Sequence, residues 1–409
     1  MAREFIMTTA QVIIGAGFGD EGKGLFTDYF STRSSTVVRF NGGAQAGHTV
    51  QLTDGRRHVF SHFGAGSFRG ARTFLSRFFV CNPLLFAREQ TELEALGVYP
   101  EVLIDGDSYV TTPYDMMVNQ IVEAARGSAR HGSVGVGFGE TVGREEETPY
   151  SLRVADLSRD DLAQRLWLIR ERWLPQRLKQ LGVETLSPQW QERIASPGAV
   201  DGFINLSRAM LERCEVTRSR YLSRQRDLVF EGAQGLMLDQ TSGFFPHVTR
   251  SHTGLRNVVA LAHDAGIRSL SLLYATRAYL TRHGAGPLPF EVGGKIYPGI
   301  EDPTNKPHAF QGSLRFAPLN LDLLHKAITR DLAHAEGVMS VHLQLGVSCL
   351  DQLPERVALV AAGAKEECDP HSLLARLRRT IRPQQLLASY GPECHCIEAT
   401  SVPALAVTA

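Results

Sequence analysis

The stretch Gln11–Gly24, QVIIGAGFGDEGKG, decides the fold of this chain. It begins with a short apolar run typical of a buried strand, and a glycine-rich turn follows at once. The apolar spacing after the turn predicts a helix from Leu25 to about Ser31. A strand that enters such a turn and then a helix favours phosphate binding, because glycines let backbone N–H groups approach phosphate oxygens and a helix N-terminus favours an anion.

The core of this turn, Gly19–Gly24, reads GDEGKG. Lys23 adds a positive point charge for a phosphate, and Asp20 places a carboxylate beside it. The strict Walker pattern has four residues between its glycines and then Lys followed by Ser or Thr, which this turn does not match. The alternative is a tight turn with solvated charges. We favour a phosphate site, and hence a nucleoside triphosphate as ligand.

The rest of the chain extends this unit into an α/β fold. A second strand over 36–40 ends in another glycine cluster, Asn41–Thr49. We expect further strands at 101–104, 227–230, 269–274 and 339–345, helices at 160–180 and 321–335, and long loops at 128–149 (mobile) and 293–318. This order predicts a large, mostly parallel sheet flanked by helices, with ligands at the carboxyl ends of its strands.

Composition excludes several classes of protein. The chain has 409 residues with 43 Lys and Arg against 43 Asp and Glu, so no global basic field draws in nucleic acid or an anionic membrane. Scattered cysteines indicate free thiols in a reducing cytoplasm, with a metal site at Cys394–Cys396 as the weaker alternative. We expect one domain over 8–400, an extension at 1–7 and a disordered tail at 401–409; either Met1 or Met7 is the native start.

Several motifs, in order, resemble the adenylosuccinate synthetase family. The first is GDEGKG followed by VVRFNGGAQAGHT, which ends at Thr49. Three later motifs also resemble parts of the family. FEGAQGLMLDQTSGFFPHVT at 230–249 resembles its nucleotide-pocket segment, and TRHGAGPLP at 281–289 resembles its threonine-arginine-glycine turn. SYGP at 389–392 resembles its base-binding loop. The resemblance covers most of the chain and implies an adenylosuccinate synthetase-like fold.

The resemblance also implies a reaction, in which the family joins aspartate to inosine monophosphate with GTP and Mg²⁺. Asp20 matches the base that takes the N1 proton and a magnesium ligand, His48 matches the acid that stabilises charge on the 6-oxygen, and the carbonyl of Gly47 matches the other magnesium contact. By position, nucleotide-binding roles fall to Gly19, Glu21, Gly22, Lys23, Gly24, Gly47, Thr49, Arg282, Gln344, Ser389 and Gly391. Substrate-binding roles fall to Gln45, Ser133, Gln234, Thr249 and Arg315.

The chain departs from the family where substrates are recognised. Val134 replaces a threonine that serves the substrate phosphate, and the arginine that a neighbouring subunit lends to this phosphate has no match within 145–150. Arg315 is the one arginine left in the region that matches the aspartate loop, and Gln344 stands where the family reads guanine with an aspartate. Aspartate and strict GTP selectivity are therefore open.

These observations predict a cytoplasmic, GTP- or ATP-dependent ligase of purine biosynthesis that phosphorylates a carbonyl oxygen of a purine-like substrate and joins an amine to that carbon. Its expected partners are small molecules and Mg²⁺, without nucleic acid or membrane, and the resemblance implies a homodimer. The alternatives are a kinase or ligase acting on a non-nucleotide metabolite and a non-catalytic nucleotide-binding paralogue. The sequence leaves the substrate, the amine and the nucleotide unnamed.

Overall fold

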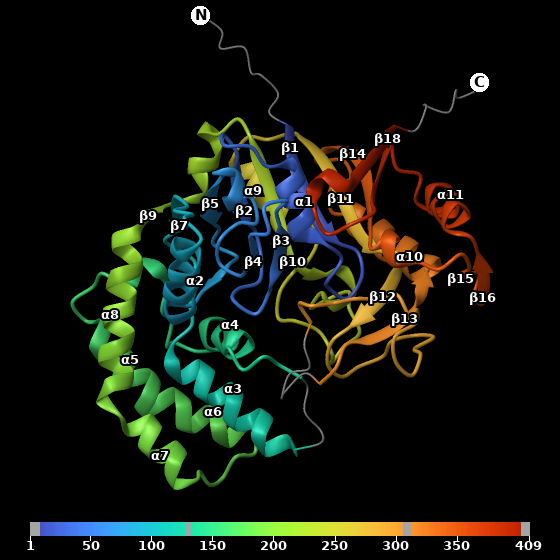
Figure 1. Ribbon diagram of the computed structural model, residues 1–409. Coiled ribbons are helices and arrows are strands. Elements are labelled where there is room, and N and C mark those ends of the chain that lie inside the picture. Colours follow the sequence, from blue (N-terminus) through green and yellow to red (C-terminus); the bar gives the residue numbers. More distant parts are fainter. Residues whose placement is uncertain (1–8, 128–131, 306–311, 402–409) are drawn as a thin grey trace, which may run out of the picture.

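A computed structural model describes residues 9–127, 132–305 and 312–401. Its centre is a ten-stranded sheet, parallel throughout except at the edge strand β18 (Figure 1). In sheet order the strands are β18 (Ile397–Ser401), β17 (Gln385–Ser389), β14 (Ser340–Ser348), β11 (Ser269–Arg277), β1 (Thr9–Gly15), β10 (Leu228–Gly235), β2 (Thr36–Arg39), β5 (Arg72–Leu75), β7 (Val102–Asp105) and β9 (Cys214–Thr217). The predicted large parallel sheet is confirmed.

Smaller sheets and the helices surround this centre. The other strands are β12 (Tyr279–Arg282), β13 (Arg315–Asn320), β15 (Val357–Ala361) and β16 (Ala364–Cys368) in one sheet, and the pairs β3 (His48–Gln51) with β4 (Arg57–Phe60) and β6 (Val80–Cys81) with β8 (Tyr109–Val110). The α-helices are α1 (Lys23–Phe30), α2 (Pro83–Ala95), α3 (Pro113–Arg126), α4 (Phe138–Glu147), α5 (Leu162–Leu168), α6 (Leu174–Gln180), α7 (Pro188–Ala195), α8 (Pro197–Arg213), α9 (Leu255–Asp264), α10 (Leu321–Leu332) and α11 (Pro370–Ile381).

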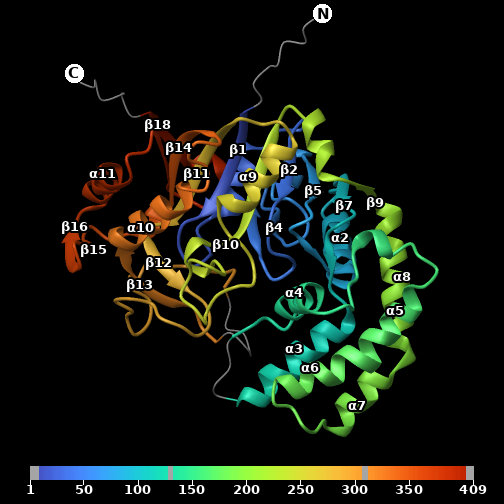
Figure 2. The ribbon, with the colours of Figure 1, turned by 180° about the vertical axis from the view of Figure 1, so that it is seen from behind.

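The central strands are apolar runs because helices cover both faces of the sheet. Val12, Ile13 and Ile14 of β1 are fully buried. Helix α1 lies on one face and α9 on the other, as the two opposite views show (Figures 1 and 2). Helices α3 to α8 gather beside one end of the sheet. A second apolar core there joins α3 and α5 to α8 with α2, β5 and β7.

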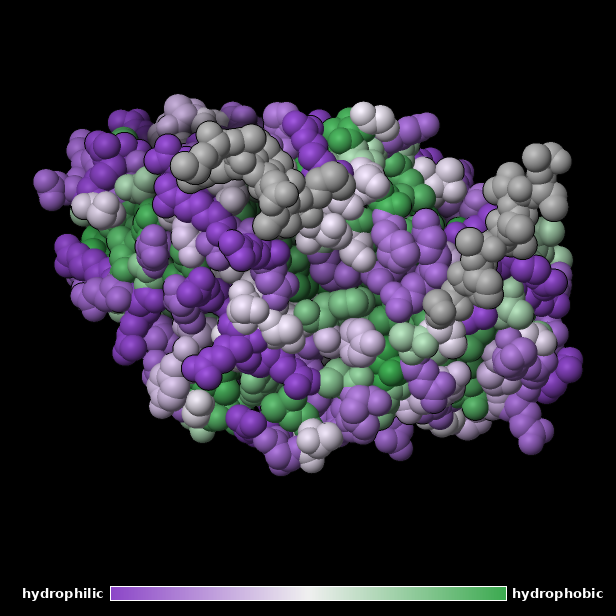
Figure 3. All heavy atoms as spheres, turned by 90° about the horizontal axis from the view of Figure 1, so that it is seen from above, coloured by the Kyte–Doolittle hydropathy of each residue, from purple (hydrophilic) through white to green (hydrophobic). Residues whose placement is uncertain are grey.

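The molecular surface is mixed in polarity. Seen from above, apolar residues lie in small groups among hydrophilic ones (Figure 3). Among the described residues, no helix has the length and apolar character needed to cross a membrane.

Several predicted elements need correction. Helix α1 begins at Lys23 rather than Leu25, because Gly22 adopts a φ of 84° and ends the turn there. The expected mobile loop at 128–149 contains α4, and the expected loop at 293–318 contains the start of β13. The helix expected at 160–180 contains α5 and α6, which are joined by a π-helical turn at Ile169–Trp173. The extension at 1–7 and most of the tail at 401–409 lie outside the described residues.

Candidate active site

The phosphate loop between β1 and α1 is built around a buried carboxylate. Glu21 Oε1 accepts the backbone N–H groups of Gly17 and Gly19, at 3.0 and 2.7 Å. Its other oxygen lies 2.6 Å from Lys23 Nζ, and both side chains are 3% exposed. Glu21 therefore stabilises the conformation of the loop through these hydrogen bonds. Since an ammonium group has three donors, Lys23 keeps hydrogen-bonding capacity for a phosphate.

Asp20 projects from this loop on a backbone with a φ of 63°. Its Oδ2 lies 3.2 Å from His283 Nε2, and its backbone carbonyl accepts a hydrogen bond from Arg277 Nε. Burial raises the pKa of Asp20, but the hydrogen bond and charge of His283, with the charges of Arg277 and Lys23, outweigh it and leave the pKa at about 2. Asp20 is a carboxylate at neutral pH, as a general base or a cation ligand must be.

His48 begins β3, and its ring is held by a carboxylate on another strand. Its Nδ1 lies 2.6 Å from Glu231 Oε1 of β10, while Glu231 Oε2 accepts the N–H of Ala65 at 3.1 Å and lies 3.7 Å from Arg39 Nε. His48 Nε2 is buried and has no hydrogen-bond partner in the described part of the chain. The pair thus presents one ring nitrogen to a ligand.

The protonation of His48 decides what that nitrogen can do. Burial lowers the pKa of His48 below its ordinary value, against the raising effect of Glu231, and the charges of Arg39 and Lys23 lower it further. A neutral ring that donates from Nδ1 offers an acceptor at Nε2, so donation to a developing oxyanion requires the ring to gain a proton. Glu231 is the group that stabilises that state. The motif FEGAQG contained this acid, but no role was predicted for Glu231 or for Arg39.

These residues face a cleft of about 560 Å³ at the carboxyl ends of β1, β11 and β14. Of the residues with predicted roles, the cleft is lined by Asp20, Gly22, Lys23, Gly24, Gly47, His48, Thr49 and Gly391. Its other charged lining residues are Arg57, Arg277, Glu301, Asp302 and Asp351. Two glycine-rich loops and the base-binding motif therefore meet at one site, where an α/β sheet typically binds its ligand.

The structure does not bring Gln344 to this cleft. It lies inside β14, opposite Leu273, and its amide group is bonded to Gln11 at 3.0 Å and Gln385 at 2.6 Å. Ser348, at the end of β14, lines the cleft instead and donates to the backbone carbonyl of Glu21. Gln344 therefore lies outside the lining of this cleft, and Ser348 stands at the strand end.

Two predicted arginines are engaged within the protein. Arg315 pairs with Glu291 and donates to the carbonyls of Gly284 and Gly286. Arg282 is 2% exposed and donates to the carbonyls of Pro287 and His247. Burial, with the nearby charge of Arg315, lowers the pKa of Arg282 to about 10. Neither guanidinium lines the cleft.

The remaining predicted residues also lie outside the cleft lining. Ser389 is buried and bonded to the carbonyl of Gly391, and Ser133 accepts a hydrogen bond from Asn119. The amide atoms of Gln45 are buried, and residues 9–127, 132–305 and 312–401 provide no hydrogen-bond partner for them, which suits a group that binds a ligand. Gly19, Gln234 and Thr249 also lie outside the lining that the described residues form.

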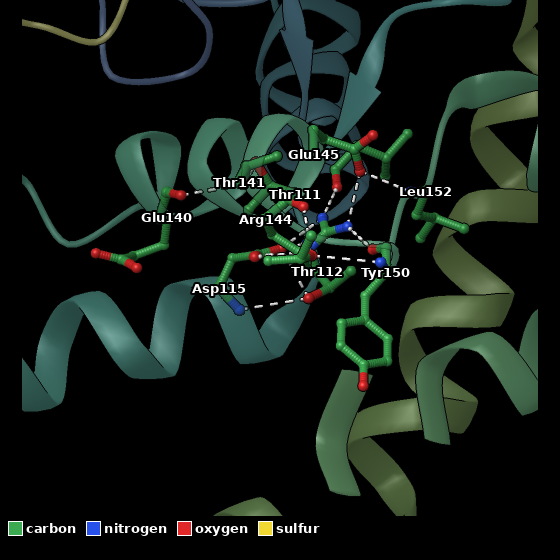
Figure 4. Close-up of polar contacts among 12 residues, drawn as sticks. Thr111, Thr112, Asp115, Glu140, Thr141, Arg144, Glu145, Tyr150 and Leu152 are labelled. Atoms are coloured by element: carbon green, nitrogen blue, oxygen red, sulfur yellow. Dashed lines mark hydrogen bonds and ion pairs between the residues drawn. The ribbon is translucent and has the colours of Figure 1, made fainter. Parts of the chain in front are cut away.

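The acidic run at 145–147 is not a free patch of negative charge. It belongs to α4, where the fully buried Arg144 is bonded to Asp115 and Glu145 and to the carbonyls of Val110 and Tyr150 (Figure 4). Glu147 pairs with Arg250 at 2.9 Å. Glu145 and Glu147 are therefore both engaged in ion pairs within the protein.

The cleft suits a hard cation. Among the described residues, no cluster of three His, Cys, Asp or Glu side chains has the arrangement of a metal site. Mg²⁺ does not need one, because it is usually held by one or two carboxylates together with substrate phosphates and water. Asp20 supplies an ionised carboxylate beside the phosphate loop, and the carbonyl of Gly47 belongs to the same lining. The donor set therefore fits Mg²⁺ bound with a nucleotide.

A second cavity of about 270 Å³ lies between α9, α10 and the segment after β10. Its buried carboxylates are already bonded: Asp331 accepts from Leu255 N–H and Tyr274 O–H, and Asp239 accepts from Thr253 N–H. The first cleft is the stronger candidate, since it joins the phosphate loop to Asp20 and His48.

The sequence of this chain is similar to those of known proteins. The family model described as adenylosuccinate synthetase matches residues 12–315. The adenylosuccinate synthetase of Thermosynechococcus vestitus is 33% identical over 292 residues, which cover 69% of this chain and 62% of the relative. That of Psychrobacter cryohalolentis is 32% identical, with 69% and 65% covered. The chain thus spans less than two thirds of the length of these relatives.

Solved structures share the fold. A fully ligated adenylosuccinate synthetase from Plasmodium falciparum superposes with a TM-score of 0.76 at 16% identity, covering 96% of this chain and 100% of the other. The succinoaminodeoxyadenylate synthetase of cyanophage S-2L gives a TM-score of 0.57 at 17% identity, covering 97% and 96%.

Proposed function

This chain belongs to the adenylosuccinate synthetase family, and from that premise we propose that it is a nucleoside triphosphate-dependent ligase that forms a C–N bond on a purine-like substrate. The observation that carries the proposal is the single cleft that contains an ionised Asp20, the phosphate loop and His48. Asp20 lies in the loop between β1 and α1, His48 begins β3, and its partner Glu231 lies in β10. Only the folded chain therefore brings these three residues together.

The proposed chemistry has two steps. Asp20 takes the N–H proton of the lactam, and the lactam oxygen attacks the γ-phosphate, so that the nucleoside diphosphate leaves. The amine then attacks the activated carbon, and orthophosphate leaves with the original oxygen. Lys23 and the N-terminal N–H groups of α1 neutralise phosphate charge, and His48, once protonated with the support of Glu231, stabilises charge on the oxygen.

Magnesium fits this chemistry with Asp20 and the carbonyl of Gly47 as the proposed protein ligands. When bound with the nucleotide, the cation neutralises charge between phosphate oxygens. GTP or ATP is the proposed phosphoryl donor, since Ser348 rather than an acid stands at the end of β14.

The substrate is proposed to be inosine monophosphate or a related purine nucleotide, with aspartate or another amine as the second substrate. The phage relative is described as bound to dGMP with dATP as an energy donor, which widens the set to test. Since Arg315 is paired with Glu291, the described residues supply no free arginine pair for a dicarboxylate there. We therefore expect poor turnover with aspartate and inosine monophosphate.

The test is orthophosphate release with GTP or ATP, inosine monophosphate or dGMP, and a panel of amines, followed by mass spectrometry of the product. Release that depends on both substrate and amine supports the ligase. Phosphorylated product without amine dependence favours the alternative of a kinase acting on another metabolite. No nucleotide turnover with any member of the panel favours a non-catalytic nucleotide-binding paralogue. We expect a cytoplasmic homodimer; light scattering tests the dimer.

A further inference from the structure

The antiparallel pair of strands β3 and β4 forms one wall of the cleft. It packs directly against the phosphate loop, since a Cβ atom added to Gly24 would lie 2.7 Å from the backbone carbonyl of Thr49. At the other end of β3, Gln51 donates to Glu393 at 3.4 Å, next to the base-binding motif that ends at Pro392. A side chain on the cleft face of this pair is therefore placed between the two parts of the proposed nucleotide site.

Arg57 lies on this cleft face. It begins β4 and is paired with Gln51 of β3 in the antiparallel register. Side chains alternate between the two faces along a strand, and residues directly opposite each other share a face. Thr49, Gln51 and Arg57 all line the cleft, whereas Val50, which lies between the first two, belongs to the apolar core. The pairing of the strands therefore turns the side chain of Arg57 toward the cleft.

The charge of Arg57 is not neutralised by the protein in the way that the other charges of the lining are. The described lining contains three Lys or Arg side chains, those of Lys23, Arg57 and Arg277. Lys23 Nζ lies 2.6 Å from Glu21 Oε2, and Arg277 Nη2 lies 3.0 Å from Asp302 Oδ2. Arg57 has no carboxylate partner among the described residues and donates to a neutral hydroxyl instead. Its positive charge is therefore free to attract an anion.

The guanidinium of Arg57 is held in place and keeps most of its donors. Its Nη2 donates to Thr304 Oγ1, which in turn lies 3.1 Å from Thr49 Oγ1. A guanidinium has five N–H groups in a planar fork that matches two phosphate oxygens at once, and the contact with Thr304 uses one of them. The described lining also contains four Asp and Glu side chains, which repel an anion. A triphosphate therefore needs a cation that is not already paired.

We propose that Arg57 binds the phosphate groups of the nucleoside triphosphate, with its guanidinium fork directed at phosphate oxygens and with Thr304 fixing its orientation. This inference rests on the proposed function, in which the cleft binds the triphosphate beside Lys23. A carboxylate of the amine substrate would offer the same kind of oxygen pair. The position of Arg57 between the phosphate loop and the base-binding motif favours the nucleotide.

Two substitutions test the charge and the fork of Arg57. Arg57→Met keeps an apolar stem and removes the guanidinium, whereas Arg57→Lys keeps a positive charge and removes the fork. In calorimetry with GTP and ATP in the presence of Mg²⁺, we expect the affinity to fall about 10- to 100-fold in Arg57→Met and by less in Arg57→Lys. The affinity for guanosine and adenosine, which have no phosphate, should stay within about twofold.

The neighbouring Arg56 provides a matched control. It is paired with Asp54, its side chain is 43% exposed, and it does not line the cleft, so Arg56→Met should leave the triphosphate affinity unchanged. The melting temperature of Arg57→Met should stay close to that of the parent, because the change leaves no carboxylate without its partner. An unchanged triphosphate affinity in Arg57→Met, an equal loss in Arg56→Met, or an equal loss of nucleoside affinity overturns the inference.

Binding is measured without turnover, so this inference and the proposed function fail separately. If the parent binds a triphosphate but releases no orthophosphate with any substrate, the ligase proposal fails, and the affinity of Arg57→Met still decides the role of Arg57. If Arg57→Met raises KM for the amine and leaves the triphosphate affinity unchanged, Arg57 serves a carboxylate of the second substrate, which overturns the inference alone. A parent that binds neither GTP nor ATP refutes both.

Discussion

Two buried groups of charged residues in this molecule are built in opposite ways. Arg144 has each of its donor nitrogens bonded: Nε and Nη2 to Asp115, Nη2 also to Val110, and Nη1 to Glu145 and Tyr150. No donor is left for a ligand, because a guanidinium has five N–H groups and five contacts use them. Figure 4 shows the acceptors arranged around this one side chain.

A second group of buried polar side chains has incomplete hydrogen bonding. Among the described residues, no hydrogen-bond partner is present for the buried atoms His48 Nε2, His283 Nδ1, the amide atoms of Gln45, and Nε and Nη2 of Arg39. Of these residues, His48 lines the cleft. Buried polar groups are normally bonded, and exceptions call for an explanation. A complete network such as that of Arg144 holds the helices α3 and α4 together, whereas the unpaired Nε2 of His48 belongs to a residue that lines the cleft and is left available to a ligand.

The largest expected effect is a loss of catalysis when Asp20 in the cleft is changed. Asp20→Asn should lower kcat by about 10²- to 10⁴-fold, because the amide cannot take a proton. The melting temperature should change little, because an asparagine oxygen still accepts from His283. Asp54→Asn, in an exposed pair with Arg56, is the matched control. A kcat within tenfold of the parent would remove Asp20 as the base.

Changing Arg144, whose hydrogen bonding is complete, should instead lower the stability of the fold. Arg144→Met should lower the free energy of unfolding by about 3–5 kcal/mol, because Asp115 and Glu145 are left buried and unpaired. Urea unfolding measures this loss. Arg88→Met is the matched control, since Arg88 and Glu92 form an exposed pair with 76% and 48% exposed side chains and such pairs contribute about 1 kcal/mol or less. Equal losses in both variants would contradict the comparison.

Lys23→Ala should weaken triphosphate binding by about 1–3 kcal/mol, the typical value of one hydrogen bond to a charged group. The ammonium group is shared between Glu21 and the ligand, so some stability is lost as well. Calorimetry with GTP and ATP in the presence of Mg²⁺ measures the affinity, and the exposed Lys179→Ala is the control. Unchanged affinity for both nucleotides would mean that the loop binds a different ligand.

The smallest expected effect is a pH dependence of stability at His48. Burial lowers the pKa of His48 in the folded state. In the unfolded chain the pKa of a histidine is about 6.5, so as pH falls below this value the unfolded chain takes up a proton that the folded chain does not. Stability therefore decreases as pH falls, by at most about 1.4 kcal/mol per pH unit from this residue. Urea midpoints at pH 5.5 and 7.5 should differ less in His48→Gln than in the parent. An unchanged difference, matching His325→Gln, would exclude this contribution.

The central fold was predictable because its signals are local. The apolar run at 11–14, the glycine-rich turn and the strand–turn–helix order specify β1, the phosphate loop and α1 without knowledge of the rest of the chain. Asp20, Lys23 and His48 were found by the same local patterns. Each of them lines the cleft.

The remaining features depend on long-range contacts. Helix α4 has glycines and an acidic run, which resemble a loop, but Phe138 and Val142 are buried and Arg144 reaches acceptors on other elements. The strand expected at 339–345 was predicted to end too early, because β14 pairs with β11 up to Ser348, which lies opposite Arg277. The contact of His283 with Asp20 joins residues far apart in the chain, and no local pattern indicates it.

The carboxylate of Glu21 gives the phosphate loop an anion of its own. The amides of Gly17 and Gly19 are already turned toward a negative charge before any nucleotide arrives. The loop therefore has little conformational entropy left to lose on binding, and we expect nucleotide association to be fast and limited by diffusion rather than by loop ordering. Stopped-flow mixing with a fluorescent nucleotide should then give an observed rate that rises linearly with nucleotide concentration, without a plateau.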